Sequence, residues 1–259
     1  VRCNMSKLPA LPDRAVCHQY EIRESHREKA DNQPPFLMSD LKQAVIRKVD
    51  FQTAKPIIVD HEWLGRMSAT SWHYALYPDA ETDLIAGVAC IGGVNCTGGS
   101  YLHVTYGLTP QEIGVFARGT CVWWAHEHSA SFLIANALKL LKKDAPHKKI
   151  ILAYSDPSAG EIGTVYQATN WYYLGRTKTT SYRYRSPDGT REFSDASIIV
   201  QAQKRGVTWK QVKQDYLDGG WKMVAQAKKH RYAFLQDKSD KRLKALLESM
   251  SMPYPKRGQ

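Results

Sequence analysis

The stretch Ile150-Ile151-Leu152-Ala153-Tyr154-Ser155-Asp156 decides the fold that the sequence predicts. Its apolar run is typical of a buried strand, and a tight turn, a short helix bearing Tyr166 and a second strand ending near Gly175 follow it. Ligands of open α/β sheets bind outside the carboxyl ends of the strands. We therefore expect a functional site where Asp156 ends the strand and Tyr166 lies close by.

The residues before this strand predict a strand–helix–strand unit. Residues 119–124 form a short apolar run, and residues 129–143 place apolar side chains at a helical period before two closing lysines. Two strands joined by a crossover helix run parallel in one sheet. The fold class that we expect is therefore α/β, with a central mixed sheet flanked by helices.

The segments on either side supply further elements. Towards the N-terminus we expect helices over residues 39–49 and 51–63, followed by antiparallel strands over residues 73–76 and 84–92. Towards the C-terminus, Pro187-Asp188-Gly189 predicts the turn of a β-hairpin. The other C-terminal elements that we expect are hairpin strands over 177–185 and 191–193, a helix over 208–227 broken at Gly219-Gly220, a strand over 232–235 and a helix over 240–250.

Composition divides the chain into three parts. Residues 1–35 are polar and end in Asn32-Gln33-Pro34-Pro35, which is typical of a loosely attached arm. Residues 36–200 hold the predicted sheet and site, and form the expected catalytic domain. Residues 201–259 are expected to form a basic helical extension that packs on this domain.

The charge balance favours a polyanionic partner. The chain has 36 Lys and Arg residues against 25 Asp and Glu residues, a formal net charge of +11. Such an excess is typical of proteins that bind DNA or RNA, and the alternative is a basic surface that only keeps the protein in solution.

The five cysteines and the hydropathy pattern exclude other classes. The cysteines are odd in number and contain no CxxC pair, so neither a disulfide framework nor a cysteine-rich zinc site is indicated. No apolar run is long enough for a membrane span, and the N-terminus does not resemble a signal peptide. We expect a cytoplasmic protein with no membrane partner.

The segment Tyr166-Gln167-Ala168-Thr169-Asn170-Trp171 resembles a pattern of the GNAT acyltransferases, Tyr-x-x-x-Gly-Phe. Asn170 replaces the glycine, and asparagine tolerates the left-handed helix cap that glycine adopts. The resemblance implies a GNAT-like sheet, and a general-acid role for Tyr166 toward a departing thiolate. The alternative is that Tyr166 only packs against the core.

Several separated blocks are similar to the phage Mom family of DNA adenine-modifying proteins. The blocks are Ala54-Lys55, His61-Glu62-Trp63-Leu64-Gly65-Arg66-Met67, Arg118, Ser129-Ala130-Ser131, Tyr154-Ser155-Asp156, Gly163-Thr164-Val165-Tyr166-Gln167-Ala168 and Asp188-Gly189-Thr190. The resemblance implies that the protein converts adenine in duplex DNA to an N6-carbamoylmethyl form, inside the bacterial host, and so shields phage DNA from restriction enzymes.

The loop before the central helix departs from the GNAT pattern. It reads Ala125-His126-Glu127-His128-Ser129-Ala130-Ser131, whereas the GNAT loop is rich in glycine. A helix N-terminus with the hydroxyl groups of Ser129 and Ser131 still attracts phosphate, but Glu127 opposes an anion. Acetyl transfer to an amine would also give an amide. An amide is not a carbamoylmethyl group, so the donor stays open between acetyl-CoA and another acyl or aminoacyl donor.

Two residues are candidates for catalysis and four for holding the donor. Asp156 either orients or deprotonates the adenine amine, or only forms the turn before Pro157. Tyr166 is the second catalytic candidate. The candidates for donor or phosphate binding are Arg118, Ser129, Ser131 and Asn170.

DNA contacts are predicted at two places. His61, Trp63 and Arg66 are expected near the target base, where an aromatic ring would stack on an extruded adenine. Basic residues near the C-terminus are expected to contact phosphates, unless they only solvate a helix. They include Lys229, Arg231, Lys241 and Arg242.

A metal centre is not expected. His126 and His128 are weak candidate ligands, but the chain has no HExxH motif and no fixed third ligand.

Two alternative functions remain open at this level. One is an ordinary acyl-CoA-dependent N-acetyltransferase that acts on a small amine or a protein. The other is a non-catalytic DNA-binding protein that reuses the fold.

Overall fold

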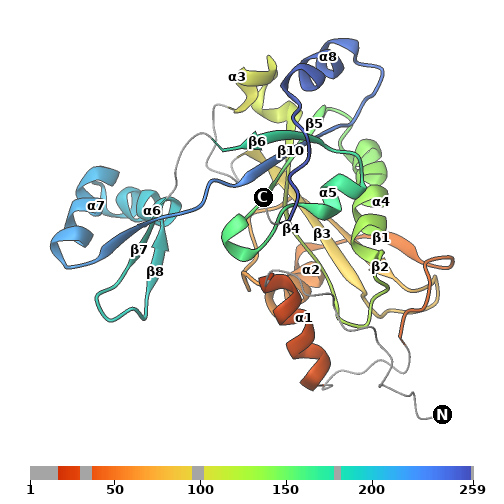
Figure 1. Cartoon of the computed structure of the whole chain (residues 1–259), viewed down its shortest axis with the longest axis horizontal. Coiled ribbons are helices and arrows are strands. Elements are labelled where there is room, and N and C mark those ends of the chain that lie inside the picture. The colour runs from red at the N-terminus through yellow and green to blue at the C-terminus, as the bar shows by residue number, and fades with distance from the viewer. Residues whose placement is uncertain (1–16, 30–36, 95–101, 178–181, 258–259) are drawn as a thin grey trace.

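The computed structural model describes residues 17–29, 37–94, 102–177 and 182–257. Its centre is a seven-stranded sheet in the order β1-β2-β3-β4-β5-β10-β6 (Figure 1). The strands are β1 (Val45–Val49), β2 (Trp72–Tyr77), β3 (Gly87–Gly93), β4 (Ile113–Cys121), β5 (Ile150–Ser155), β6 (Tyr172–Arg176) and β10 (His230–Leu235). Strands β4 and β5 are parallel, as expected, and the other neighbouring pairs are antiparallel. Strand β4 begins at Ile113, however, before the run expected over 119–124, and pairs with β5 only over residues 113–116.

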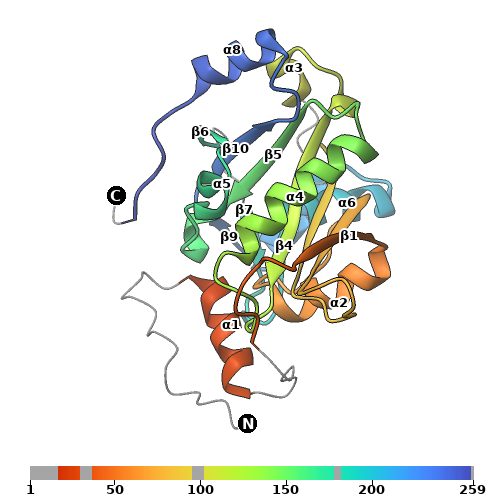
Figure 2. The same ribbon diagram turned by 90° about the vertical axis from the view of Figure 1, so that its right-hand side faces the viewer.

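Helices cover both faces of this sheet, which confirms the expected mixed α/β class. On one face, α4 (Ser129–Asp144) and α5 (Thr164–Ala168) bury apolar side chains against β2 to β5 and β10. On the other face, α2 (Phe51–His61) packs against β2 and β3, while α8 (Lys241–Met250) and α3 (Leu102–Tyr106) cover β4, β5 and β10. Figure 2 shows α2 and α8 at opposite ends of the molecule. None of the described helices is long and apolar enough to cross a membrane.

Strands β4 and β5 separate towards their carboxyl ends. They pair over residues 113–116 and 150–153, whereas the rest of β4 pairs with β3 alone. The register between β3 and β4 shifts here, because Cys90 lies opposite Arg118 and Ile91 opposite Phe116. Ala117 is therefore an extra residue, a β-bulge of the kind that redirects side chains beside functional sites. The opening that follows from this separation positions the candidate site.

The structure corrects two expectations at the N-terminal end. Residues 39–49 were expected to be helical, but Val45–Val49 form β1 because β2 offers an edge for pairing and two of the three valine and isoleucine side chains join the core beside α2. The expected arm is also in part a helix, α1 (His18–Lys29). Hydrogen bonds from Arg23 to the carbonyl groups of Trp123 and Ala125 attach it to the main body. The rest of the arm, residues 1–16 and 30–35, lies outside the described residues.

A second, three-stranded sheet lies to one side of the main body (Figure 1). It contains β7 (Tyr182–Arg185), β8 (Glu192–Ser194) and β9 (Lys222–Ala225), with α6 (Asp195–Arg205) and α7 (Trp209–Asp218) beside it. The β7–β8 pair confirms the hairpin predicted from Pro187-Asp188-Gly189. The helix expected over 208–227 instead ends at Asp218. Gly220 has a φ of +78°, which turns the chain into β9.

The last part of the chain is built into the main sheet. Strand β10 lies between β5 and β6 and pairs with both. The expected boundary at residue 200 therefore divides the sheet, and residues 201–259 are not only an extension that packs on it. Local sequence does not reveal such an insertion, because it depends on pairing between distant segments.

Candidate active site

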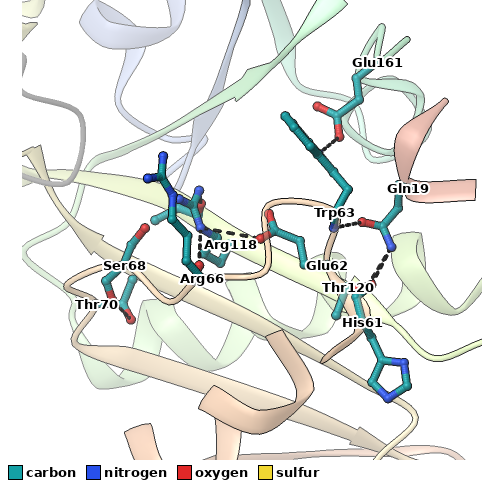
Figure 3. A network of polar contacts seen from close by, with 11 residues as sticks. Gln19, His61, Glu62, Trp63, Arg66, Ser68, Thr70, Arg118, Thr120 and Glu161 are labelled. Atoms are coloured by element: carbon teal, nitrogen blue, oxygen red, sulfur yellow. Dashed lines mark hydrogen bonds and ion pairs between the residues drawn. The ribbon is translucent and has the colours of Figure 1, made fainter. Parts of the chain in front are cut away.

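Seven side chains gather where β4 and β5 separate, and we call them the acid–arginine cluster. They come from the segment after α2, from β4, from the turn after β5 and from α5: Glu62, Trp63, Arg66, Arg118, Asp156, Glu161 and Tyr166. The part of the cluster drawn in Figure 3 shows Glu62 between Arg118 and Trp63.

Glu62 is a buried carboxyl group beside Arg118. Its side chain is 9% exposed and its Oε2 lies 3.6 Å from Arg118 Nε. Burial raises the pKa of Glu62 to about 7, although Arg118 and Arg66 act to lower it. The acid and base forms of this carboxyl group therefore coexist near neutral pH.

Arg118 holds the walls of the site together. Its Nε donates a hydrogen bond to the carbonyl oxygen of Arg66 at 3.0 Å, and its Nη1 donates to that of Ala117 at 2.7 Å. The bulge at Ala117 lets Arg118 occupy the position opposite Cys90. Arg118 therefore contacts Glu62 and two backbone carbonyl groups, and its contact with a phosphate stays a prediction.

Trp63 and Glu161 join the two sides of the opening. Trp63 Nε1 donates to Glu161 Oε1 at 2.9 Å, and the backbone N–H of Asp156 donates to Glu161 Oε2 at 3.0 Å. Burial raises the pKa of Glu161. The backbone N–H of Trp63 donates to Gln19 of α1 at 3.2 Å, so the N-terminal helix helps to hold this wall.

Asp156 is buried and caps the turn after β5. Its Oδ1 accepts hydrogen bonds from the backbone N–H and the hydroxyl group of Ser158, at 3.0 and 2.6 Å. Its Oδ2 lies 3.5 Å from Lys229 Nζ. The structure thus brings Asp156 and Lys229 together at the edge of the cluster, with Asp156 in the turn-forming role that the sequence left open.

Tyr166 lies in the core with its phenol directed among charged groups. Its ring packs against Phe116, Trp171 and Tyr232. Gly163, with a φ of +72°, permits this packing, because a Cβ there would lie 2.4 Å from the Tyr232 ring. Burial raises the pKa of Tyr166 strongly, and the charges of Glu161 and Glu62 raise it further. Tyr166 is therefore a protonated group at neutral pH.

A second feature, the α4 groove, runs along the outer side of α4. It has a volume of about 600 Å³, and its lining includes His128, Ser131, Lys139, Lys142 and Asn170. Asn170 has the expected left-handed conformation, with a φ of +59°. Ser131 and Asn170 thus meet in one cavity. Ser129 does not, because it is fully buried and its hydroxyl faces Met38 Sδ at 3.9 Å.

Other predicted residues lie away from the cluster. The ring of His61 points away from Glu62 (Figure 3) and packs against that of His26 at 4.4 Å. Arg231 lies in β10 opposite Tyr154 and donates to the carbonyl oxygen of Leu174. Lys241 and Arg242 lie on α8, at the far end of the molecule from α2.

The weak metal candidates lie close together without forming a larger set. The rings of His126 and His128 are 5.3 Å apart, and His128 Nε2 lies 3.6 Å from a Glu127 carboxylate oxygen. Within the described segments, no three His, Cys, Asp or Glu side chains are arranged to hold a metal ion.

Sequence reasoning missed Glu62, Glu161 and Gln19. Glu62 lies between His61 and Trp63, which were both predicted to be site residues. This position in the sequence was the only indication that Glu62 belongs to the site. Which of the three side chains faces the opening depends on where α2 ends. The helix ends with Glu62 as its C-cap, whose backbone N–H donates to the carbonyl oxygen of Ile58, and this directs the Glu62 side chain towards Arg118.

A sequence model of the Mom protein family matches residues 43–256. No curated protein matches the chain. An N-acetyltransferase from Staphylococcus aureus Mu50 is similar in structure, with a TM-score of 0.39 and 9% identity over 74% of this chain and 97% of that chain. A spermidine N-acetyltransferase from Vibrio cholerae, solved with CoA and spermine, has a TM-score of 0.39 and 11% identity over 75% of this chain and 96% of that chain.

The family match includes every block from which the resemblance was inferred, and it extends almost to the C-terminus. It confirms that resemblance over most of the chain. The chain belongs to the Mom protein family.

Proposed function

We propose that the protein is a transferase that modifies the N6 amine of adenine in double-stranded DNA, with an N6-carbamoylmethyl product. The observation that carries the proposal is that the family match over residues 43–256 encloses the whole acid–arginine cluster. A buried set of carboxyl, guanidinium and phenol groups is suited to proton transfer, and its pKa values are displaced by burial.

The residues of the cluster fall into separate roles. Tyr166, which is protonated, would donate a proton to the departing group of the donor. Trp63 is half-buried, and its indole is fixed by Glu161, so its ring would stack on an adenine extruded from the duplex. Asp156 would keep the turn in place and hold Lys229 beside the site rather than act as the base.

The α4 groove fits the requirements of an elongated anionic donor. Apolar side chains of α4 line part of it, and Lys139, Lys142 and Lys238 bring positive charge. Helix α5 links the two features, since Tyr166 belongs to the cluster and Ala168 lines the groove. We propose that Ser131, Asn170 and these lysines hold an acyl or aminoacyl donor. That donor would supply the group that is transferred.

The positive charge of the chain suits a DNA substrate. Arg66 is exposed at the mouth of the cluster, and among the described residues its guanidinium group has no carboxylate within ion-pair distance. It would contact a phosphate beside the target base, with Lys229 nearby. Lys241 and Arg242 lie on a distant helix and would add only weak, salt-sensitive contacts.

Mass spectrometry of nucleosides tests the proposal. DNA from cells that express the wild-type chain is compared with DNA from cells that express Tyr166→Phe, and with the exposed control Asp83→Ala. We expect a new adenosine species with the mass of a carbamoylmethyl adduct for the wild type and the control, and at least about tenfold less for Tyr166→Phe.

Other results would favour the alternative functions. Unmodified DNA together with acetylation of a small amine or a protein by the purified chain would indicate an ordinary N-acetyltransferase. Unmodified DNA with tight, salt-sensitive DNA binding that Tyr166→Phe leaves unchanged would indicate a non-catalytic DNA-binding protein.

A further inference from the structure

Glu62 is a buried carboxyl group whose hydrogen-bonding capacity is not used. Its Oε2 is inaccessible to solvent and accepts no hydrogen bond from any described residue. The nearest cation, Arg118 Nε, lies 3.6 Å away, beyond ordinary hydrogen-bond distance. Buried polar atoms in folded proteins are nearly always satisfied, and exceptions concentrate at functional positions.

The other two acids of the cluster are occupied. Both carboxylate oxygens of Glu161 accept hydrogen bonds, one from Trp63 and one from the backbone of Asp156. Asp156 accepts two hydrogen bonds from Ser158 and pairs with Lys229. These contacts occupy both carboxylate oxygens of Asp156. Glu62 alone retains an oxygen that is free to take a proton.

Charged and titratable groups from several elements surround Glu62. Arg118 of β4 and Arg66 of its own loop favour the carboxylate, while Glu161 from the turn after β5 opposes it. The thiol of Cys90 on β3 and the phenol of Tyr166 on α5 also face it. Burial outweighs the two cations, so the carboxyl group is neither a strong acid nor permanently protonated at neutral pH.

The backbone at Glu62 is held firmly. Its N–H donates to the carbonyl oxygen of Ile58 at 3.1 Å, and its own carbonyl accepts from Gly65 at 2.8 Å. The preceding carbonyl, that of His61, accepts from Gln19 at 2.7 Å and from Thr120 at 2.8 Å. A rigid support of this kind keeps a reactive group in position.

We propose that Glu62 is the catalytic residue that accepts the proton of the adenine N6 amine. This inference deepens the proposed function and rests on it. The N6 atom forms a bond to the electrophilic carbon of the group that the donor transfers. For a carbamoylmethyl product this carbon is the methylene carbon of that group, since attack on an acyl carbon would give an amide. The bond from that carbon to its leaving group breaks, and the leaving group retains the electron pair. The N6 proton moves to the Glu62 carboxylate, and solvent removes it after the product leaves.

The chemistry of adenine explains why a base is needed. The lone pair of its exocyclic amine is delocalised into the ring, so positive charge builds up on nitrogen as the new bond forms. A base beside that nitrogen removes the proton as this charge develops. Trp63, the next residue in the chain, would hold the extruded base by stacking, which brings N6 close to Glu62.

The test compares Glu62→Gln with the exposed control Glu81→Gln in a single-turnover assay on duplex DNA. We expect Glu62→Gln to slow modification by about 100-fold or more, and the control to match the wild type. DNA binding should change less than about threefold in both variants. The wild-type rate should rise with pH through about 7, and Glu62→Gln should lose this rise.

A second variant, Glu62→Asp, distinguishes the loss of a base from a folding defect. Glu62→Asp keeps a carboxylate but withdraws it from the substrate, so its rate should fall and the inflection of its pH profile should move. Wild-type rates and an unchanged pH profile in both Glu62 variants, with DNA modification intact, would overturn the inference and leave the proposed function standing. If the wild-type protein itself does not modify adenine, both fail together.

Discussion

The acid–arginine cluster and the α4 groove are built from opposite kinds of contact. In the cluster, carboxyl groups pack beside Arg118 away from solvent, and burial raises the pKa values of Glu62 and Glu161. In the groove, lysine side chains extend into solvent beside apolar residues of α4. Electrostatic interactions are strong where water is excluded and weak where it is not. The cluster is therefore suited to chemistry and the groove to binding.

This difference separates two kinds of kinetic effect. A change in the cluster should lower the rate of the chemical step, whereas a change in the groove should raise the donor concentration needed for half-maximal rate. Helix α5 contributes to both, which would place a donor bound in the groove close to the groups that move protons.

A large effect, close to that of Glu62→Gln, is expected for Arg118→Met, which disrupts the cluster. The substitution removes the cation beside Glu62 and the hydrogen bonds to the carbonyl groups of Arg66 and Ala117. Because Arg118 lowers the pKa of Glu62, its loss should raise that pKa above about 7 and leave less carboxylate at neutral pH. Modification should fall by about 100-fold and recover in part at higher pH.

The measurement is the pH profile of the single-turnover rate, with the exposed Arg185→Met as control. A profile for Arg118→Met that coincides with that of the wild type would show that this arginine does not tune the base. A uniform loss at every pH would assign it a structural role alone.

A smaller effect is expected for charge reversal in the groove. Lys142 lines the groove, whereas its neighbour Lys143 on α4 does not, so Lys142→Glu and Lys143→Glu form a matched pair. Lys142→Glu should raise the half-saturating donor concentration by about tenfold, since one reversed charge near an anion costs roughly 1 kcal/mol or more. The maximal rate should stay close to that of the wild type.

Steady-state kinetics over a range of donor concentrations separates the two variants. Equal donor dependence in Lys142→Glu and Lys143→Glu would move the donor site out of the groove. A fall in the maximal rate without a change in half-saturation would instead connect the groove to the chemical step.

The last effect is expected in stability rather than in activity. The pKa of Glu62 rises from 4.5 to about 7 on folding, so the protonated form stabilises the native state below pH 4.5 and this stabilisation is lost as the pH rises to 7. Glu62→Gln is neutral throughout. It should be more stable than the wild type at pH 8 by at most about 3 kcal/mol, and about equal to it at pH 4.5.

Thermal unfolding at the two pH values checks this prediction, with Glu81→Gln as the exposed control. Each kcal/mol corresponds to about 2–4 °C in a chain of this size. A difference of the same size at both pH values would mean that ionisation of Glu62 does not oppose folding.

Local sequence accounted for the centre of the fold. The apolar run at residues 150–154 specified β5, and the helical period after Ser129 specified α4. The crossover predicted the parallel pairing of β4 and β5, although the paired residues 113–116 lie before the strand expected over 119–124. Asp156 and Tyr166 were expected near the carboxyl end of β5 for the same reason, and both lie there. These features depend on neighbouring residues, which a sequence displays directly.

Tertiary structure alone decided the rest. Residues 45–49 became a strand because β2 had a free edge. Strand β10 entered the sheet between β5 and β6 although residues 177–229 separate it from β6 in the chain. Glu62 joined Arg118 and Tyr166 through the end of one helix, a bulge in β4 and the turn before α5. Strand pairing and burial between distant segments produced these features. The sequence determined which chemical groups the protein has, and the fold determined which of them are shielded from water and therefore have shifted pKa values.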